Sequence, residues 1–387
     1  GKGSACVMTQ SILTAAGFRT GLYISPHLDQ FNERISIDGQ MISDADLRRL
    51  AARVRAAAET LGEEPTDFEM ITAMAFCWFE EQRCDLVVLE VGMGGRLDAT
   101  NVIPSPEVCA IMHIGLDHTE FLGDTVEKVA AEKAGILKPG ADCVLYHQLP
   151  GVMDVVQQRF ADVNPGAAAR LITTDPSAFT ARARTIDGQV FGYRNRPDLR
   201  IQLLGNYQME NAMAVLDIID CLIRRGFGIS ENAIWAGLAQ ATWPGRFEVL
   251  SREPLLIVDG AHNPNGVEAL VDTIRAYFPD QKINFVMGVM KDKDYHTMLR
   301  LIAPYAARFI TELPDAHRAL RPEALKSEIR AYFDGPVETA DSVTAAVERA
   351  MEIAEGTDVI TICFGSLYQV AEIRNYFISS SRSTSNV

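Results

Sequence analysis

A glycine-lysine-glycine-serine stretch, Gly1–Ser4, opens directly into a helical pattern. Glycines at such a junction let backbone N–H groups face an anion, the helix N-terminus adds positive potential, and Lys2 supplies a point charge. The stretch matches the back half of a phosphate-binding loop and predicts a nucleotide site. A basic, flexible terminus explains the same four residues equally well, so the choice depends on the rest of the chain.

An acidic residue follows an apolar strand pattern later in the chain. Glu90 ends the run Leu86–Leu89 and precedes the loop Val91–Arg96, which contains three glycines. A carboxylate at the end of a buried strand is typical of the magnesium ligand that accompanies a phosphate loop. The alternative is a solvated strand end before a flexible loop, and we favour the magnesium ligand.

Two other strand ends carry polar groups. Ser25 follows the strand pattern Thr20–Ile24, and His118 lies just past the pattern Val108–His113. Ligands of open α/β sheets bind beyond the carboxyl ends of the strands. Each residue alone is more typical of a turn or of a structural histidine, and Lys133, near the end of a helix, is alone typical of a solvated cation. Their convergence on one sheet edge would make them a site.

The second half of the chain contains a similar arrangement. The strand pattern Leu255–Val258 runs into Asp259–Pro264, which reads Asp-Gly-Ala-His-Asn-Pro and opens another helix. A plain linker rarely combines these polar residues with proline at the first helical position. Arg246 lies in the preceding interruption, Trp243–Arg246, where we expect a hinge and a ligand between two domains.

Strand and helix patterns alternate along the chain and would position these groups. Continuous apolar strands such as Leu86–Leu89 are typical of buried parallel sheets, so the alternation predicts a doubly wound α/β fold. We predict a P-loop-type parallel-sheet ATPase domain plus a smaller Rossmann-like α/β C-terminal domain. The predicted boundaries are 1–243 for the first domain, 244–248 for the hinge, 249–378 for the second domain and 379–387 for a disordered, serine-rich tail.

Composition excludes several classes of protein. The 387 residues are 48% hydrophobic and 22% charged, as in a soluble globular protein of two domains. The 36 basic and 51 acidic residues give a net charge of −15, which argues against a nucleic-acid partner. Seven cysteines without a CxxC pair argue against a disulfide framework and favour the cytoplasm. The sequence contains no run of 18 apolar residues, so it predicts no membrane-spanning helix. We also expect the protein to be a monomer.

These stretches together resemble the folylpolyglutamate synthase and dihydrofolate synthase family, within the Mur ligase superfamily. The motifs EVGMGGRLDATN and DGAHNP, in this order, are highly specific, whereas GKGS alone is weak. The resemblance runs from Gly1 to about Phe377. The similar segments are GKGS at 1–4, LYISPHLDQFNERI at 22–35, TDFE at 66–69, LEVGMGGRLDATNVI at 89–103, GLDHTEFLGDTVEKVAAEKAGILKPG at 115–140, GNYQMEN at 205–211, PGRFE at 244–248, DGAHNP at 259–264 and FGSLYQVAEIR at 364–374.

The resemblance implies an ATP-dependent ligase with small-molecule partners. It would join L-glutamate to dihydropteroate, or to the γ-carboxylate of tetrahydrofolate polyglutamates, through an acyl phosphate. The implied cofactor is Mg²⁺, with Ser25, Glu90 and His118 as its ligands. Lys133 matches a lysine that is carbamylated in the family, and a carbamate turns this cation into an anion that helps to hold magnesium.

The resemblance also assigns the remaining site residues. The implied catalytic residues are Lys133, Glu90 and His262, the last near the reacting carboxylate. The implied ATP contacts are Gly1, Lys2, Gly3, Ser4, Asn211, Arg246 and Asp259. The implied pterin-binding residues are Thr66, Asp67, Phe68, Glu69, Leu97, Asp98 and Ala99.

The sequence departs from the family pattern at its beginning. The family loop reads Gly-Thr-Asn before Gly-Lys-Gly and follows a strand, and neither is present here. We therefore expect a fragment whose central sheet lacks a core strand, and which is poorly stable or inactive. Two alternatives stay open: another amide ligase of the superfamily, acting on a peptidoglycan precursor, and a non-catalytic nucleotide-binding switch protein.

Overall fold

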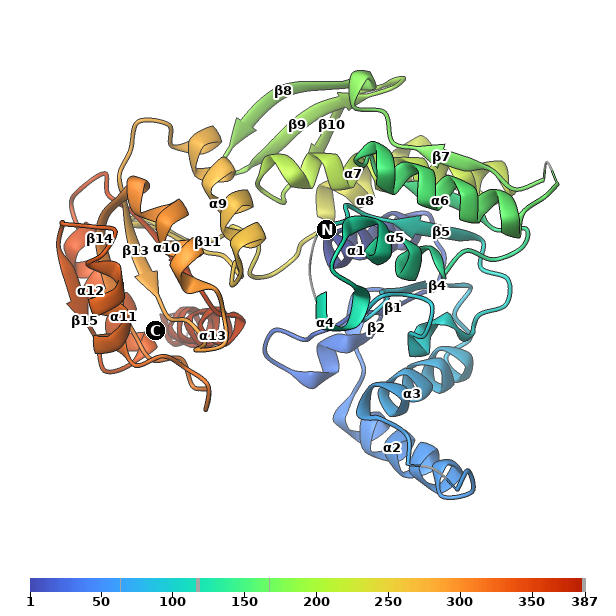
Figure 1. Cartoon of the computed structure of the whole chain (residues 1–387), viewed down its shortest axis with the longest axis horizontal. Helices are drawn as coiled ribbons and strands as arrows, with labels where there is room; N and C mark the ends of the chain where they lie inside the picture. Colours follow the sequence, from blue (N-terminus) through green and yellow to red (C-terminus); the bar gives the residue numbers. More distant parts are fainter. Residues whose placement is uncertain (63, 116–118, 167, 385–387) are drawn as a thin grey trace. The chain divides into compact units, whose positions relative to one another are not determined.

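The computed structural model describes residues 1–62, 64–115, 119–166 and 168–384 (Figure 1). The chain divides into two units, each described by itself below. The division at Trp243 falls beside the interruption on which the sequence-based boundary rests. The first unit comprises Gly1–Ala183, Gln189–Gln202 and Gln208–Thr242, and the second comprises Arg184–Gly188, Leu203–Tyr207 and Trp243–Val387.

The first sheet of unit 1 has the order β3-β2-β1-β4. Strand β1 (Thr20–Tyr23) pairs in parallel with β4 (Leu86–Leu89) and antiparallel with β2 (Ile35–Ile37). A tight turn links β2 to β3 (Gln40–Met41), and its residues Asp38 and Gly39 have φ angles of 50° and 78°. Positive φ at both turn residues is what a two-residue hairpin requires. The sequence predicts a small hairpin here, from the Asp38-Gly39 pair between the alternating residues of Arg34–Ile42, and the structure confirms it.

The second sheet of unit 1 is wholly parallel, in the order β5-β6-β7. Its strands are β5 (Val108–Ile111), β6 (Asp142–Leu145) and β7 (Leu171–Thr173), and helices α5 (Val126–Ala134) and α6 (Pro150–Val163) share its apolar core. The α/β class predicted from the sequence is confirmed. One continuous sheet is not found, because β4 and β5 have no pairing with each other and each ends its own sheet.

A third sheet of unit 1 is an antiparallel meander, in the order β10-β9-β8. The sequence predicts its first hairpin, formed by β8 (Phe179–Thr185) and β9 (Gly188–Tyr193). It does not predict β10 (Arg196–Ile201), which has a register shift between Arg196 and Leu199 and a residue at positive φ, Asp198. Such a bulge interrupts the two-residue alternation by which strands are recognised.

Helix α1 (Lys2–Ala15) packs closely against α8 (Glu231–Gln240) through Gly237. A Cβ atom at position 237 would lie 2.4 Å from the Cα atom of Ile12. The Ser11 hydroxyl donates a hydrogen bond to the Gly237 carbonyl oxygen at 2.7 Å. Glycine is therefore required at this helix crossing, because any side chain would collide with backbone.

We expect Gly237→Ala to lower the free energy of unfolding of unit 1 by about 1–3 kcal/mol, the usual effect of overpacking. Urea denaturation followed by circular dichroism measures this. Gly228→Ala is the matched control, because a Cβ atom there meets nothing within 4 Å. Equal stability of the two variants would contradict the close crossing.

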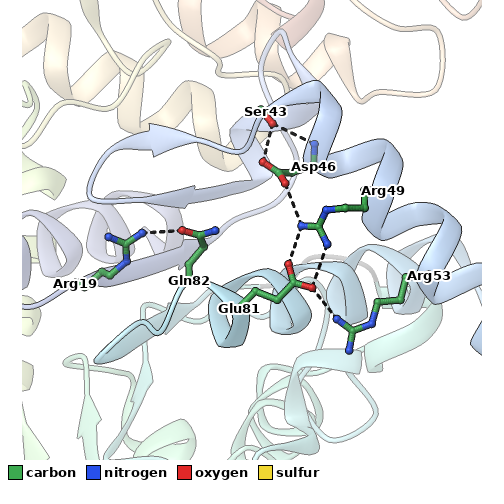
Figure 2. Close-up of polar contacts among 7 residues, drawn as sticks. All are labelled: Arg19, Ser43, Asp46, Arg49, Arg53, Glu81 and Gln82. Atoms are coloured by element: carbon green, nitrogen blue, oxygen red, sulfur yellow. Dashed lines mark hydrogen bonds and ion pairs between the residues drawn. The ribbon is translucent and has the colours of Figure 1, made fainter.

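Helices α2 (Asp44–Ala58) and α3 (Asp67–Glu81) are joined by a network of charged side chains (Figure 2). The Glu81 carboxylate accepts hydrogen bonds from Arg49 and Arg53 of α2, each at 2.7 Å. These pairs lie at the surface, where an ion pair contributes about 0–1 kcal/mol. Burial of apolar side chains, including Leu50 and Trp78, contributes more to holding the two helices together.

Unit 2 contains a six-stranded sheet in the order β11-β12-β16-β13-β14-β15. All neighbours are parallel except β11 and β12. Helices α9 (Pro264–Tyr277), α10 (Tyr295–Ile302) and α11 (Pro322–Ile329) share one apolar core with the sheet, and α12 (Val343–Ala354) also contacts it. The strands are β11 (Glu248–Arg252), β12 (Leu255–Val258), β13 (Ile283–Met287), β14 (Ala306–Thr311), β15 (Val337–Thr339) and β16 (Ile360–Phe364).

The last helix, α13 (Leu367–Thr384), continues past Ser379. The predicted disordered tail is therefore wrong for residues 379–384, since the serine-rich sequence extends the preceding helix, and 385–387 lie outside the described residues. Within the described parts of the chain, no helix combines the length and apolar character that crossing a membrane requires.

Candidate functional site

The predicted phosphate loop begins helix α1, with Gly1 at its N-cap. The Ala5 N–H donates to the Gly1 carbonyl oxygen at 3.0 Å, which starts the helix. Gly1 lies against Asn211 of helix α7 (Asn206–Arg224), since a Cβ atom on Gly1 would be 2.4 Å from the Asn211 Oδ1 atom. The N–H groups of a helix's first turn lack partners within the helix and attract anions. The structure thus brings together the residues predicted to contact the phosphates and the adenine side of ATP.

Lys2 and Glu90 lie near each other at the carboxyl end of β4. The Lys2 ammonium donates to the Gly92 carbonyl oxygen at 3.2 Å. Glu90 is buried, its N–H donates to the Tyr23 carbonyl oxygen at 2.8 Å, and its carboxylate accepts the Ser25 N–H at 3.1 Å. The predicted magnesium ligands Ser25 and Glu90 are therefore neighbours, at the ends of the paired strands β1 and β4.

Lys2 and Glu90 both affect the pKa of Cys6, which lies one turn further along α1. Burial raises the pKa of the Cys6 thiol strongly, the Glu90 carboxylate raises that pKa further, and the Lys2 ammonium lowers it. Cys6 is consequently a neutral thiol, and it lacks the thiolate character that a nucleophile needs.

One cavity of about 530 Å³ in unit 1 collects three of the predicted site residues. Lys2 of α1, Glu90 at the end of β4 and Lys133 of α5 all line it, as does Gly94. These residues come from segments far apart in the sequence. Lys133 was expected to belong to the site only if the fold placed it beside the strand-end residues, and it lines the same cavity as Glu90. The remaining lining is mainly apolar and follows β4 and β5.

The described residues fit a magnesium ion. Magnesium binds oxygen ligands and usually takes only one or two carboxylates, completing its shell with water and substrate phosphate. Glu90 provides a buried carboxylate beside Ser25, next to a loop suited to phosphate. The third predicted ligand, His118, lies outside the described residues, and the described residues contain no group of three His, Cys, Asp or Glu side chains placed to hold a metal.

The first predicted pterin segment forms the beginning of α3. The Thr66 hydroxyl accepts the Glu69 N–H at 3.3 Å, and the Glu69 carboxylate accepts the Thr66 N–H at 2.7 Å. This is a capping box, so both side chains have a structural role in this structure. Asp67 is exposed, whereas the Phe68 ring lies against Gly92, where a Cβ atom would be 2.6 Å from the ring. Phe68 is therefore in contact with the glycine-rich loop that Lys2 also touches.

The second predicted pterin segment is held in shape by Asp98. Its carboxylate accepts the Met93 N–H at 2.9 Å and the Thr100 N–H at 3.0 Å, which closes the loop after β4. Leu97 is 80% exposed, and Ala99 is half-buried. The exposed Leu97 side chain is therefore available to an apolar ligand.

In unit 2, Arg246, Asp259 and His262 converge at the carboxyl end of β12. The Arg246 guanidinium occupies the space beside Gly260, where a Cβ atom would lie 2.2 Å from its Nη1 atom. The buried Asp259 carboxylate accepts the N–H groups of Phe247 and Ala261, each at 2.8 Å. His262 pairs through Nδ1 with the Gly260 carbonyl oxygen at 2.8 Å. Burial raises the pKa of Asp259 above its usual value, and the Arg246 charge opposes that rise.

We expect Asp259→Ala to lower the free energy of unfolding of unit 2 by about 1–3 kcal/mol, because two buried N–H groups lose their acceptor. Thermal unfolding followed by near-ultraviolet circular dichroism measures the loss. Asp272→Ala is the control, since the ion pair of Asp272 with Arg275 lies at the exposed surface. A change of less than about 0.5 kcal/mol at Asp259 would show that its hydrogen bonds are dispensable.

His27 and Arg34 form a hydrogen bond in the segment that follows β1, and the sequence had suggested no role for either residue. The Arg34 Nε atom donates to His27 Nδ1 at 2.8 Å, and the guanidinium lies over the Phe31 ring at 5.5 Å. Burial and the Arg34 charge lower the pKa of His27, so its imidazole is neutral at pH 7. Their only signal in the sequence was membership of the segment 22–35, because the contact depends on how the loop after Ser25 folds back.

Comparisons with known proteins agree with this architecture. Residues 47–219 match the Mur ligase middle domain, and residues 245–366 match the Mur ligase, glutamate ligase domain. The dihydrofolate synthase/folylpolyglutamate synthase of Bacillus subtilis is 33% identical, and the folylpolyglutamate synthase of Lacticaseibacillus casei is 35% identical. Each comparison covers 97% of this chain and 87% of the relative.

Solved structures give the same result. A folylpolyglutamate synthase of Mycobacterium tuberculosis, complexed with ADP and AMPPCP, is 32% identical with a TM-score of 0.85, covering 97% of this chain and 89% of that chain. The folylpolyglutamate synthase of Thermotoga maritima also has a TM-score of 0.85 at 32% identity, covering 98% and 87%. An FPGS-AMPPCP-folate complex has a TM-score of 0.81 at 32% identity, covering 98% and 88%.

Proposed function

Because the chain belongs to the dihydrofolate synthase/folylpolyglutamate synthase family of Mur ligases, we propose that it ligates L-glutamate to a pterin or folate carboxylate at the expense of ATP. The acceptor is dihydropteroate, tetrahydrofolate with its polyglutamates, or both. The observation that carries the proposal is the cavity where Lys2, Glu90 and Lys133 converge beside the N-terminus of α1. Relatives bound to ADP, AMPPCP and folate support the choice of substrates.

The proposed first step is attack by the acceptor carboxylate on the γ-phosphorus of ATP. The bond from phosphorus to the bridging oxygen breaks, ADP leaves, and an acyl phosphate forms. Two anions meet in this step, so fixed positive groups lower its barrier. Lys2 and the amides of Gly1–Ser4 hold the phosphates, and Asn211 contacts the adenine side. Arg246 and Asp259 of unit 2 contribute further ATP contacts.

Magnesium, when bound, neutralises phosphate charge, and we assign Ser25, Glu90 and His118 as its protein ligands. Glu90 keeps its carboxylate in place through the Ser25 N–H. We propose that Lys133 is carbamylated, because its unmodified ammonium would repel the metal. Lys133 lines the same cavity as Glu90, which supports this assignment.

The proposed second step is attack by the uncharged amine of glutamate on the acyl carbon. A tetrahedral intermediate forms, and phosphate leaves to give the amide. We assign His262 as a catalytic residue that lies near the reacting carboxylate. Pterin binding is assigned to the two segments Thr66–Glu69 and Leu97–Ala99. The capping box of Thr66 and Glu69 and the hydrogen bonds of Asp98 hold these segments in shape.

Product analysis tests the proposal. The chain is incubated with ATP, Mg²⁺ and labelled glutamate, with dihydropteroate, tetrahydrofolate or a UDP-muramoyl substrate as acceptor. We expect ADP release to equal label incorporation into dihydropteroate, tetrahydrofolate or both. Label in the UDP-muramoyl product alone, or nucleotide binding without ligation of any acceptor, would overturn the proposal and favour one of the two alternatives.

Three finer assignments accompany the function. We propose a cytoplasmic location, which the seven free cysteines support because a reducing compartment keeps thiols free. We propose that the enzyme acts as a monomer, and sedimentation velocity would measure this. Mass spectrometry of intact protein prepared in bicarbonate would show the carbamate on Lys133 as an added carbon dioxide.

A further inference from the structure

We propose that residues 312–320, which follow β14, form a proton-controlled flap on the sheet of unit 2. The flap is closed while the Glu312 side chain is neutral, and it opens when that side chain ionises. The movement lies within unit 2 and goes beyond the ligase reaction, because no substrate of that reaction takes part in it. Three features of the flap support this: a fully buried carboxyl group, surroundings that offer it no donor, and a weak attachment to the sheet.

Glu312 is the residue through which the flap contacts the sheet. Its side chain is 0% exposed and packs over Gly288, which follows β13, so that even a Cβ atom at position 288 would collide with the carboxyl group. The same Cβ atom would lie 2.7 Å from the Pro314 ring. The Glu312 N–H donates to the Met287 carbonyl oxygen at 3.2 Å, which joins the start of the flap to β13. Glycine at 288 therefore leaves the space that the closed flap occupies.

The Glu312 carboxyl group has no donor and no counter-charge. Neither of its oxygens has a hydrogen-bond partner in the part of the chain that the structure describes. Burial raises the pKa of Glu312 well above its ordinary value, and the Glu372 carboxylate of α13 raises that pKa further. No lysine, arginine or histidine of the described ranges is among the groups that shift it.

The other titratable groups around Glu312 add no positive charge. Burial raises the pKa of Glu372, and Asp315 of the flap raises it further. On the neighbouring strand β16, burial raises the pKa of the Cys363 thiol, and the Glu312 carboxylate raises it as well. Glu312 is therefore surrounded by acids and by a neutral thiol.

These surroundings admit the neutral side chain and reject the ionised one. Burying an unpaired charge is far more costly than burying a neutral polar group. An ionised Glu312 therefore gains hydration by leaving its place over Gly288. Because Pro314 packs against the same glycine, the side chain leaves together with the flap.

The far end of the flap is fastened by backbone hydrogen bonds to the segment after β13. The Lys291 N–H donates to the Arg318 carbonyl oxygen, and the Leu320 N–H donates to the Val289 carbonyl oxygen, each at 2.8 Å. Between the two ends of the flap, Leu313 is 42% exposed. Local opening requires least free energy where buried apolar contacts are few and backbone bonds lie near solvent. The Lys291 and Leu320 amides therefore report whether the flap is closed.

The flap borders the strand-end loops of unit 2. Gly365, after β16, packs so closely on the Gly288 carbonyl oxygen that a Cβ atom there would collide with it. The Gly365 N–H donates at 2.9 Å to the carbonyl oxygen of Ala261, the neighbour of His262. Ligands of open parallel sheets bind beyond these strand ends. Opening of the flap therefore makes access to this edge of the sheet dependent on pH.

The direction of that dependence follows from the proton bound to Glu312. In the open flap the pKa of this side chain returns to its ordinary value of 4.5, whereas in the closed flap it is higher. Between the two values, opening releases a proton, so each pH unit favours the open flap by up to about tenfold. Above the pKa of the closed flap, no further gain is expected.

Hydrogen exchange measured by NMR at about pH 5 and pH 8 tests the proposal, with protection expressed relative to the unfolded chain at the same pH. We expect the protection of the Lys291 and Leu320 amides to fall at least about tenfold between the two pH values. The control is the Phe309 amide, which donates to the Pro336 carbonyl oxygen and should keep its protection. In Glu312→Gln, the Lys291 and Leu320 amides should stay as protected at pH 8 as at pH 5.

A second variant opens the flap without a change of charge. Gly288→Ala places a methyl group where the Glu312 carboxyl group lies, and the φ angle of residue 288 suits alanine. We expect the Lys291 and Leu320 amides of this variant to be at least about tenfold less protected than those of the parent at pH 5. Their protection should change little between pH 5 and pH 8, and Phe309 should stay protected.

Three results would overturn the proposal. Equal protection of Lys291 and Leu320 at both pH values in the parent would mean that the flap does not respond to protons. An equal fall in the parent and in Glu312→Gln would assign the response to another group. A matching fall at Phe309 would show that the whole sheet loosens and that the flap does not open separately.

Discussion

Replacing Glu90 by glutamine is expected to lower kcat for ATP-dependent ligation by about a hundred- to a thousandfold, the scale of losing one preorganised electrostatic contact to a transition state. Glutamine keeps the size of the side chain, and its carbonyl oxygen still accepts the Ser25 N–H that now binds the carboxylate at 3.1 Å. The variant therefore removes the negative charge at the end of β4 with little change in geometry. That charge is what the proposed magnesium ligand supplies.

The measurement is initial velocity of ADP release at varied ATP and magnesium concentrations. Glu80→Gln is the matched control, because Glu80 is an exposed residue of α3 away from the cavity, and its activity should stay within about twofold of the parent. Circular dichroism confirms that both variants fold. Ligase activity of Glu90→Gln within about tenfold of the parent would exclude Glu90 from the proposed role.

Glu312→Gln is expected to stabilise unit 2 at neutral pH by about 1–3 kcal/mol, the scale of an unsatisfied buried polar group. Glu312 follows β14, is 0% exposed, and neither carboxylate oxygen has a hydrogen-bond partner among the described residues. Its side chain lies over Gly288, where even a Cβ atom would collide with it. Burial raises the pKa of Glu312 well above its ordinary value of 4.5, and the Glu372 carboxylate raises it further.

The direction of the pH dependence follows from that raised pKa. Between 4.5 and the higher pKa of the folded state, the folded protein binds more protons than the unfolded chain. The free energy of unfolding therefore falls as pH rises through this window, and the loss is complete above the folded-state pKa. Glutamine does not titrate, so this part of the slope disappears in the variant.

Urea denaturation of unit 2 at intervals from pH 4.5 to 8 measures the effect, starting at the ordinary pKa of the side chain. The parent and Glu312→Gln should differ little at the acid end and diverge as pH rises. Glu323→Gln, at an exposed position of α11, serves as the control and should follow the parent throughout. Parallel curves for the parent and Glu312→Gln would show that Glu312 has a partner or is hydrated in solution.

Elements and motifs that depend only on neighbours along the chain can be predicted from the sequence. The apolar pattern of Tyr207–Arg225 predicts a helix, and the structure has α7 (Asn206–Arg224) there. An apolar face that repeats every three to four residues is a local property of the sequence. The turn at Asp38-Gly39 was equally local, since only certain residues adopt its backbone angles. Specific motifs such as EVGMGGRLDATN were sufficient for the family, which the comparisons confirm.

Tertiary structure alone decided which of these elements meet. Strands β4 and β5 each have a clear sequence signal, yet neither signal states which strands they pair with, and β4 pairs with β1 while β5 pairs with β6. Strand pairing depends on contacts between distant segments, which local patterns do not encode. The predicted pterin residues also have structural contacts that the sequence pattern did not indicate. Thr66 and Glu69 cap helix α3, and Asp98 closes the loop after β4, because their side chains accept backbone N–H groups.

The burial of individual polar groups was also decided by the fold. Gly1 and Asn211 are separated by most of the first unit in sequence and are in contact. Glu312 is fully buried, and its carboxylate has no hydrogen-bond partner among the described residues. Residue type predicts exposure for glutamate, since burying a charge is costly. A glutamate side chain is buried only where several elements pack around it together. Which elements do so is decided by the tertiary fold and not by the local sequence.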